Sequence, residues 1–182
     1  MLIKFFFFFL TTLGFQTSSM NLVNESNPKE NSFNEKWNFI SDEVMGGVSS
    51  GKLEIISDMD SFFYRLNGSV STQNNGGFIQ FRSKIELDKD EFKGLRLTLR
   101  GIENSYFVHI TTTYTFLPWQ YYSFKVDVDE SWRTIDIPFD NFKKSHAFQP
   151  LNFKSDQIKT IGFVAKGNDF NATLDIKKIY LF

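Results

Sequence analysis

Short stretches in which apolar and polar residues alternate one by one run through residues 37–182 of this chain. In KGLRLTLRG, residues 93–101, leucine occupies every second position, at Leu95, Leu97 and Leu99. Because successive side chains of a β-strand point to opposite faces, this period of two predicts a strand with one apolar and one polar face. The apolar face of such a strand needs a second layer to cover it, and the sequence contains no long amphipathic helix. The pattern therefore predicts two β-sheets packed face to face.

About eight such strands are expected, separated by turns rich in Gly, Asn and Asp. They are residues 62–70, 77–85, 93–101, 106–114, 121–128, 132–138, 158–165 and 173–182. One helical turn is expected after Pro138, in FDNFKKS. Strands of this number without an internal repeat predict an all-β fold, a jelly-roll β-sandwich.

The same alternation assigns polar side chains to the outside of the sandwich. Arg82 lies opposite the apolar side chains of its strand, and Arg100 lies opposite the three leucines of its own. His109 and the threonines that follow it join the same surface if their strand is a neighbour of the other two. We therefore expect one polar sheet face, rich in arginine and hydroxyl groups, that contains Arg82, Arg100 and His109.

The first 36 residues differ in character from the rest. Residues 1–19, MLIKFFFFFLTTLGFQTSS, combine Lys4 with an apolar run shorter than the roughly 20 residues preferred for a membrane span. They match an export signal cleaved near Ser19, which predicts a periplasmic or extracellular protein. Two alternatives stay open: an uncleaved N-terminal membrane anchor, and a cytoplasmic protein whose translation starts at Met20. Residues 20–36 are polar and are expected to form a disordered tether before a domain at residues 37–182.

Charge and residue content argue against several classes of function. The formal net charge of −1 gives no basic excess for nucleic acid, and the absence of cysteine excludes disulfides and thiolate chemistry. His109 and His146 are the only histidines, and no nucleophile elbow, zinc motif or phosphate-binding loop accompanies them. We therefore expect a protein that is not an enzyme and needs no cofactor, and we assign no catalytic residue. A hydrolase that uses His109 remains an alternative.

A calcium ion is a second alternative, because small β-sandwiches often bind calcium near a chain terminus. Asp42, Glu43 and Asp175 offer carboxylate oxygens for it. Calcium sites of this kind have no reliable spacing, so no metal ligand is assigned.

Aromatic residues crowd the segment TTTYTFLPWQYYS, which includes Tyr114, Trp119, Tyr121 and Tyr122. Exposed tyrosine and tryptophan supply a flat apolar surface with a polar edge, which suits stacking on a sugar ring or on a protein partner. Alternatively, these side chains close one end of the sandwich.

Several ordered motifs resemble the complex I intermediate-associated protein 30 family. SDEVMGGVSSGKL, which follows Trp37, resembles its Asp-x-x-Met-Gly-Gly-x-Ser element, and NNGGFIQFRS resembles its Gly-Gly-Phe-x-x-x-Arg element. The matching positions are Asp42, Met45, Gly46, Gly47 and Ser49, then Gly76, Gly77, Phe78 and Arg82. Two later segments match through Arg100, Gly101 and Tyr106, and through Phe124, Trp132, Pro138, Phe139 and Phe142. The chain departs from the family pattern at residues 102–104 and 169–171.

The resemblance implies a galactose-binding-like jelly roll, and mitochondrial members act as non-catalytic assembly factors for NADH:ubiquinone oxidoreductase. We therefore expect a non-enzymatic binding domain for a protein partner or multi-subunit complex, with an exported carbohydrate-binding domain as the alternative. Membrane contact is expected only through an uncleaved N-terminal segment. The candidate binding residues are Asp42, Met45, Gly46 and Gly47 in the first loop, Arg82, Arg100, Tyr106 and His109 on the surface, and Trp119, Tyr121 and Tyr122 for a sugar.

Overall fold

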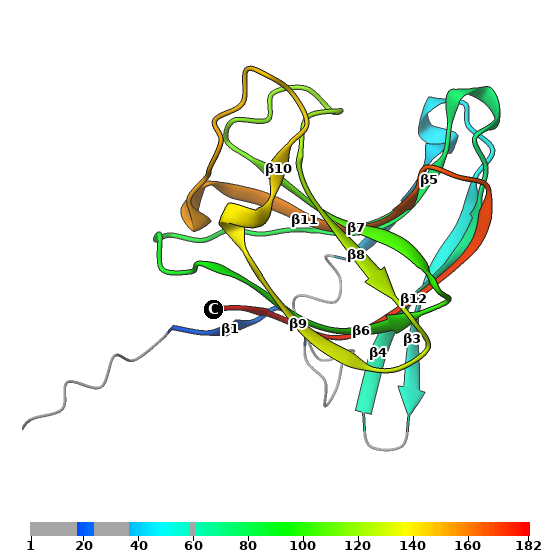
Figure 1. Ribbon diagram of the computed structural model, residues 1–182, viewed down its shortest axis with the longest axis horizontal. Coiled ribbons are helices and arrows are strands. Elements are labelled where there is room, and N and C mark those ends of the chain that lie inside the picture. The colour runs from blue at the N-terminus through cyan, green and yellow to red at the C-terminus, as the bar shows by residue number, and fades with distance from the viewer. Residues whose placement is uncertain (1–17, 24–36, 59–60) are drawn as a thin grey trace, which may run out of the picture.

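A computed structural model describes residues 18–23, 37–58 and 61–182, and these form two antiparallel sheets that lie face to face (Figure 1). Sheet A contains β1 (Met20–Asn21), β3 (Ser50–Asp58), β4 (Ser61–Val70), β6 (Gly94–Gly101), β9 (Arg133–Pro138) and β12 (Phe170–Leu181). Sheet B contains β2 (Asn38–Ser41), β5 (Phe78–Lys84), β7 (Asn104–Thr112), β8 (Tyr122–Val128), β10 (Lys143–Lys144) and β11 (Ile158–Lys166). The all-β sandwich expected from the sequence is confirmed.

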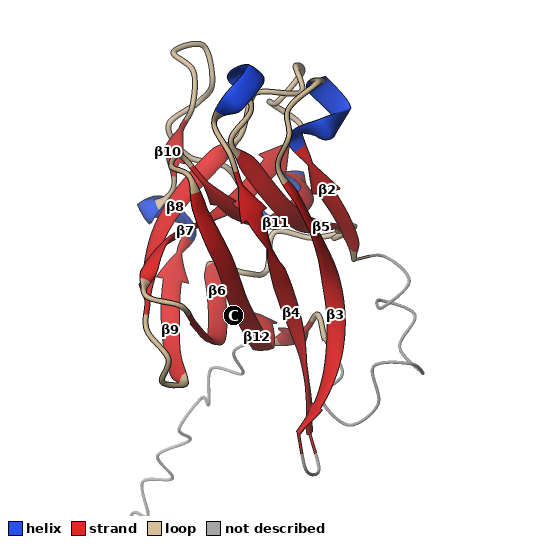
Figure 2. Cartoon of the chain, turned by 90° about the vertical axis from the view of Figure 1, so that its right-hand side faces the viewer, coloured by secondary structure: helices blue, strands red, loops and turns tan. Residues whose placement is uncertain are grey.

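The strand order explains how the chain alternates between the two layers. Sheet A runs β3-β4-β12-β6-β9, with β1 beside β12, and sheet B runs β10-β8-β7-β11-β5-β2. Within the described part of the chain, four short 3-10 turns lie at strand ends: η3 (Asp42–Met45), η4 (Gln73–Asn75), η5 (Phe139–Asn141) and η6 (Ser155–Gln157) (Figure 2). The expected helical turn after Pro138 is η5. Among the described residues, no helix has the length and apolar character needed to span a membrane.

All eight expected strands are present, and the described chain adds four more, β1, β2, β3 and β10. The sequence pattern missed β3 because this strand lies at an edge of sheet A, where most of its side chains are exposed or half-buried. A strand that is solvated on both faces does not need regular alternation.

The core between the sheets is built from the inward side chains that the alternation identified. Leu95, Leu97 and Leu99 are buried, and the rings of Trp37, Tyr64, Phe81 and Phe163 pack together with centroids 5.1 to 6.2 Å apart. Aromatic clusters of this kind supply much of the apolar area that a sandwich of this size buries.

The prediction of a single arginine-rich face is wrong for Arg100. Arg82 lies on β5 in sheet B, whereas Arg100 lies on β6 in sheet A, so the two guanidinium groups are on opposite outer faces of the sandwich. His109 lies on β7, which shares sheet B with β5, so Arg82 and His109 do occupy one face. Alternation predicts whether a side chain points inward or outward, but it does not predict the sheet to which its strand belongs.

The expected tether is also wrong at its first residues. Met20 and Asn21 pair with Leu181 and Tyr180 of β12, and Leu22 and Val23 are buried in the core. The pairing of β12 with β4 ends at Ile176, so the last residues of β12 offer free backbone partners on that side, and Leu22 N donates to Ile179 O at 2.8 Å. Residues 24–36 and the expected signal at residues 1–17 lie outside the described residues.

Candidate functional site

The outer face of sheet B carries a band of polar and aromatic side chains on its central strands. Arg82 of β5, Gly162 of β11, His109 of β7 and Ser123 of β8 follow one another in register across the sheet. Gly162 carries no side chain, and a Cβ there would lie 3.2 Å from the Cβ of Arg82. The surface of the sheet is therefore recessed between Arg82 and His109.

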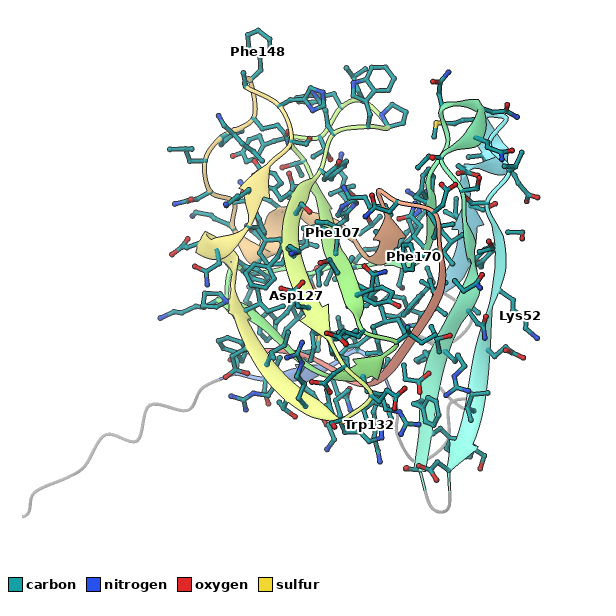
Figure 3. All side chains as sticks on the ribbon, turned by 45° about the vertical axis from the view of Figure 1, so that its right-hand side comes forward. Lys52, Phe107, Asp127, Trp132, Phe148 and Phe170 are labelled. Atoms are coloured by element: carbon teal, nitrogen blue, oxygen red, sulfur yellow. The ribbon has the colours of Figure 1, made fainter. Side chains whose placement is uncertain are left out.

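A stack of rings and one ammonium group rises from the middle of the same face. The ring of Tyr121 lies parallel to the imidazole of His109, with centroids 3.9 Å apart. Lys166 Nζ lies 4.8 Å from the Tyr121 ring centroid and 4.7 Å from that of Phe107, and it donates a hydrogen bond to Tyr121 Oη at 3.1 Å. Figure 3 shows Phe107 on the strands of this face. Cation–π contacts and stacking hold these rings in fixed positions.

His109 is neutral in this environment. Burial, together with the ammonium group of Lys166, lowers the pKa of His109 from its ordinary 6.5 to about 3. Its Nε2 atom is buried and has no hydrogen-bond partner among the described residues. A general base works best with a pKa near the operating pH, so His109 is poorly suited to that role.

A depression of about 560 Å³ opens at one end of this face, beside the aromatic loop of residues 113–121. Its walls combine three cationic side chains with a carboxylate, hydroxyl groups and an apolar wall. The lining residues are Arg82, Lys84, Ile85, Glu86, Thr111, Thr115, Phe116, Leu117, Pro118, Lys159 and Thr160. Thr111 Oγ1 and Thr160 Oγ1 are hydrogen-bonded to each other at 2.6 Å.

A β-bulge places Lys159 in this lining. Ile158 pairs with Thr112 and Thr160 pairs with Thr111, so Lys159 is an extra residue in β11 without a partner on β7. Lys159 and Thr160 therefore both line the depression, which strict alternation forbids for successive residues.

Two neighbouring loops at the same end of the molecule expose large apolar side chains. Phe116 and Trp119 of the aromatic loop are 81% and 58% exposed, and Phe148 and Leu151 of the loop at residues 145–151 are 99% and 75% exposed. Hydrogen bonds between Ser145 and Tyr121 join the two loops. Figure 3 shows Phe148 at the outermost point of its loop.

The glycine-rich loop after Trp37 is held together by the buried carboxylate of Asp42. This carboxylate accepts hydrogen bonds from Ser49 Oγ at 2.6 Å, from Ser49 N at 2.9 Å, and from the backbone amides of Gly77 and Phe78. Side chains at Gly47 or Gly76 would collide with it. Burial raises the pKa of Asp42, but the hydrogen bonds outweigh this effect and hold the pKa below its ordinary value. Gly47, Gly76 and Gly77 thus lie directly against one buried carboxylate.

A comparison with models of protein families gives a match over most of the chain. The family model described as complex I intermediate-associated protein 30 matches residues 26–176.

The chain belongs to the complex I intermediate-associated protein 30 family. A comparison with curated protein sequences gives no match.

Solved structures give the fold. A family 11 carbohydrate-binding module from Clostridium thermocellum, in complex with a β-1,3-1,4-mixed-linked tetrasaccharide, is similar with a TM-score of 0.66 and 18% identity, covering 81% of this chain and 88% of that one. A family 11 module of a cellulosomal cellulase of Clostridium thermocellum has a TM-score of 0.68 and 17% identity, covering 90% and 94% of the two chains. An exo-β-agarase has a TM-score of 0.58 and 10% identity, covering 87% of this chain and 24% of that one. At these identities the likeness establishes a shared jelly-roll fold.

The motif residues that match the complex I intermediate-associated protein 30 family do not form one site, because some are buried and others are exposed. Asp42 and Gly47 belong to the buried carboxylate site, while Met45 and Gly46 lie at the exposed tip of its loop. Tyr106 is buried, and its hydroxyl donates to Thr173 O at 3.1 Å. Tyr106 is therefore part of the core rather than of an exposed binding surface.

Arg100 has a structural partner. On the outer face of sheet A, the carboxylate of Asp175 accepts hydrogen bonds from Arg65 Nε and Nη2 at 2.6 and 2.7 Å and from Arg100 Nε at 2.9 Å. Asp175 is only 2% exposed. Because its carboxylate is committed to two arginines, Asp175 is a poor calcium ligand. The carboxylate of Asp42 is also occupied, by the Ser49 hydroxyl and by backbone amides. No cluster of three His, Asp or Glu residues suited to a metal ion occurs among the described residues.

The three aromatic residues predicted to bind a sugar also lie in three different environments. Tyr122 is buried with its hydroxyl donated to Pro150 O, Tyr121 lies on the face of sheet B, and Trp119 is exposed on the loop. Sequence reasoning missed Phe107, Lys166 and Lys159. The alternation within residues 106–114 gives a signal for Phe107, because it shares the outward phase of His109.

Proposed function

We propose that this chain is a non-enzymatic carbohydrate-binding domain that holds its ligand on the outer face of sheet B. The observation that carries this proposal is the fixed ring of Tyr121, stacked on His109 and bound by Lys166. Gln80 and Arg82 stand on the neighbouring strand of the same face, beyond Gly162. A rigid ring beside amide, guanidinium and hydroxyl groups suits a sugar, which presents an apolar ring face and a rim of hydroxyl groups.

The similar solved structures favour the same ligand class. One of them is a family 11 carbohydrate-binding module in complex with a tetrasaccharide. The fold alone does not specify a ligand, so the proposal depends on the side chains of this chain.

The chemistry available on this face favours binding over catalysis. Glu86 is the one carboxylate in the lining of the depression, whereas glycoside hydrolysis generally uses two carboxyl groups on either side of the bond. The other titratable candidate, His109, has a pKa too low for efficient proton transfer near neutral pH.

Affinity electrophoresis of the full chain against neutral and acidic polysaccharides tests the proposal. We expect at least one polysaccharide to retard the protein, and we expect the retardation to fall in Tyr121→Ala and Gln80→Ala. Trp132→Ala is the matched control, because Trp132 packs against Phe63 and Arg100 of sheet A. Retardation that is equal in all three variants would contradict the assignment to sheet B.

A protein partner is a second candidate, favoured by the apolar loop tips. Phe116 and Phe148 are more than four-fifths exposed on neighbouring loops, and exposed aromatic residues of this kind are enriched at protein interfaces. The family name refers to association with complex I intermediates. In this candidate function, Phe148→Ser with Leu151→Ser, two exposed residues outside the lining of the depression, should abolish recovery of the partner in a pull-down while leaving polysaccharide retardation unchanged.

We also propose that the protein is exported by residues 1–19. Lys4 and the apolar run after it support this proposal. N-terminal sequencing of the mature protein tests it. A mature start near Ser19 supports export, whereas an intact start at Met20 with complex I subunits in the pull-down supports the assembly role instead.

A further inference from the structure

We infer that the depression beside the aromatic loop binds the carboxylate groups of an acidic polysaccharide, a chain that contains uronic acid residues. This inference rests on the proposed carbohydrate-binding function and specifies its ligand class. Its starting point is the contrast between Arg82 and three other arginines of the sheet faces, Arg65, Arg96 and Arg100. Arg65 and Arg100 bind Asp175, and Arg96 binds Asp136 at 2.6 and 2.7 Å. Arg82 forms no ion pair or hydrogen bond through its side chain with any described residue.

Two lysines without ion pairs stand beside Arg82 in the same depression. Lys84 is two residues further along β5, and Lys159 enters from the bulge in β11. Neither forms an ion pair among the described residues, while Lys52, Lys89, Lys125 and Lys154 do. Glu86 is the one opposing carboxylate in the lining, so cations outnumber anions three to one. The whole chain has a net charge of −1, so this excess is local.

The rest of the lining suits a sugar better than a small inorganic anion. Phe116, Leu117 and Pro118 form an apolar wall, and the hydroxyl groups of Thr111 and Thr160 lie in the floor. An apolar wall provides a surface for a sugar ring, while a guanidinium group can donate two parallel hydrogen bonds to a carboxylate. A volume of about 560 Å³ exceeds the need of a single carboxylate and accommodates a short saccharide.

Binding of polygalacturonate, of its methyl-esterified form and of neutral mixed-linkage β-glucan to the full chain tests this inference by isothermal titration calorimetry. The first two probes share a backbone and differ in charge. We expect polygalacturonate to bind at least about tenfold more tightly than its ester, with an affinity that falls as the Debye length shortens from about 30 Å at 0.01 M salt to about 8 Å at 0.15 M. Arg82→Gln and Lys84→Gln should each weaken binding by about tenfold or more, because a hydrogen bond to a charged group contributes about 1.5–3 kcal/mol.

The matched controls remove similar charges elsewhere. Arg96→Gln and Lys52→Gln change exposed cations on sheet A and should leave the affinity unchanged. Equal binding of the ester and the acid, with no effect of Arg82→Gln, would overturn this inference and leave carbohydrate binding intact. Absence of binding to all three polysaccharides would overturn both proposals. Poly-L-glutamate is a fourth probe, and if it bound as tightly as polygalacturonate and lost affinity in the same variants, the ligand would be an acidic peptide and the inference would be wrong.

Discussion

The ring of Tyr121 lies 3.9 Å from the imidazole of His109, and the two planes differ by only 10°. Tyr121 directly precedes β8, whereas His109 lies within β7, so the stack fixes the end of the aromatic loop against the sheet. Lys166 of β11, on the other side of β7, donates a hydrogen bond from Nζ to Tyr121 Oη and so fixes the ring from that side. The proposed binding face is therefore rigid before any ligand arrives, which lowers the entropy cost of binding.

Replacing Tyr121 with alanine should weaken polysaccharide binding by about tenfold, because aromatic stacking contributes about 0.5–1.5 kcal/mol beyond the buried area. Trp119→Ala is the informative comparison, since Trp119 is exposed on the loop and lies outside the stack. Calorimetric titration of both variants measures the effect. A larger loss in Trp119→Ala than in Tyr121→Ala would move the sugar-binding surface from the sheet to the loop.

Acidification should destabilise the protein through His109. The pKa of His109 is about 3 in the folded chain and about 6.5 in the unfolded chain, so between these values the unfolded state binds more protons. Stability therefore rises with pH across this window, and the loss from neutral pH to about pH 4.5 is about 2–3 kcal/mol for this group. Urea unfolding at both pH values should show this loss in the native protein and a smaller one in His109→Gln.

His146 provides the control for this measurement, because it lies exposed on its loop. His146→Gln should respond to acid as the native protein does. If acidification lowered the unfolding free energy of His109→Gln as much as that of the native protein, His109 would be protonated in the folded state.

Loss of the Asp42 charge should destabilise the first loop. In Asp42→Asn an amide NH₂ group replaces one acceptor oxygen and faces donors from Ser49, Gly77 or Phe78, which should cost about 2–3 kcal/mol. The pKa of Asp42 is below its ordinary 3.8 in the folded protein, so its stabilisation is present above about pH 4 and is lost as the pH falls through the lower folded value. Thermal unfolding checks both statements. Asp169→Asn is the control, because Asp169 accepts hydrogen bonds from neighbouring Thr72 but is exposed, and it should cost less.

The two glycines at residues 46 and 47 should respond differently to alanine. A methyl group at Gly47 would collide with the side chain of Asp42. A methyl group at Gly46 would have no other atom within 4 Å. Gly46 has a φ of 85°, so Gly46→Ala should cost only the backbone term of about 1–2 kcal/mol. Gly47→Ala should cost more, because it also displaces the buried carboxylate. Equal melting temperatures for the two variants would contradict this account of the loop.

Two arginine–carboxylate pairs with the same geometry should differ in their contribution to stability. Asp175 and Asp136 each accept bonds of 2.6 and 2.7 Å from one arginine, but the side chain of Asp175 is 3% exposed and that of Asp136 is 45% exposed. Asp175→Asn leaves Arg65 and Arg100 facing each other without a counter-charge and should cost about 3 kcal/mol. Asp136→Asn should cost less than about 1 kcal/mol. Equal unfolding free energies would show that Asp175 is not buried in solution.

Much of the fold follows from the period of two, because burial of one strand face constrains every second residue. It predicted the core positions of Leu95, Leu97 and Leu99, which are buried, and the strands on which they lie. It did not predict that β5 and β6, consecutive in the chain, belong to different sheets, because pairing depends on tertiary contacts between distant segments. This is why Arg82 and Arg100 were expected on one face.

The candidate site was less predictable than the fold. Alternation alone assigned Arg82 to an outer face, and it assigned His109 there on the condition that its strand is a neighbour. The cationic depression also needs Lys159, which reaches it through a β-bulge. A bulge changes the phase of one strand relative to its neighbour and leaves no regular sign in the sequence. Tyr106 was expected on the binding surface because it matches a family motif. It is buried, so its match to the motif reflects a place in the core.

The central claim is that the outer face of sheet B binds a carbohydrate. Two-dimensional NMR of the isotopically labelled full chain, titrated with oligogalacturonate, tests it most directly. The account predicts chemical-shift changes that begin at Arg82, Lys84 and Lys159, extend to His109 and Lys166, and leave the Asp175 region of sheet A unchanged. An unchanged spectrum with oligogalacturonate and with neutral β-glucan oligosaccharides, or changes confined to the loop that carries Phe148, would contradict it.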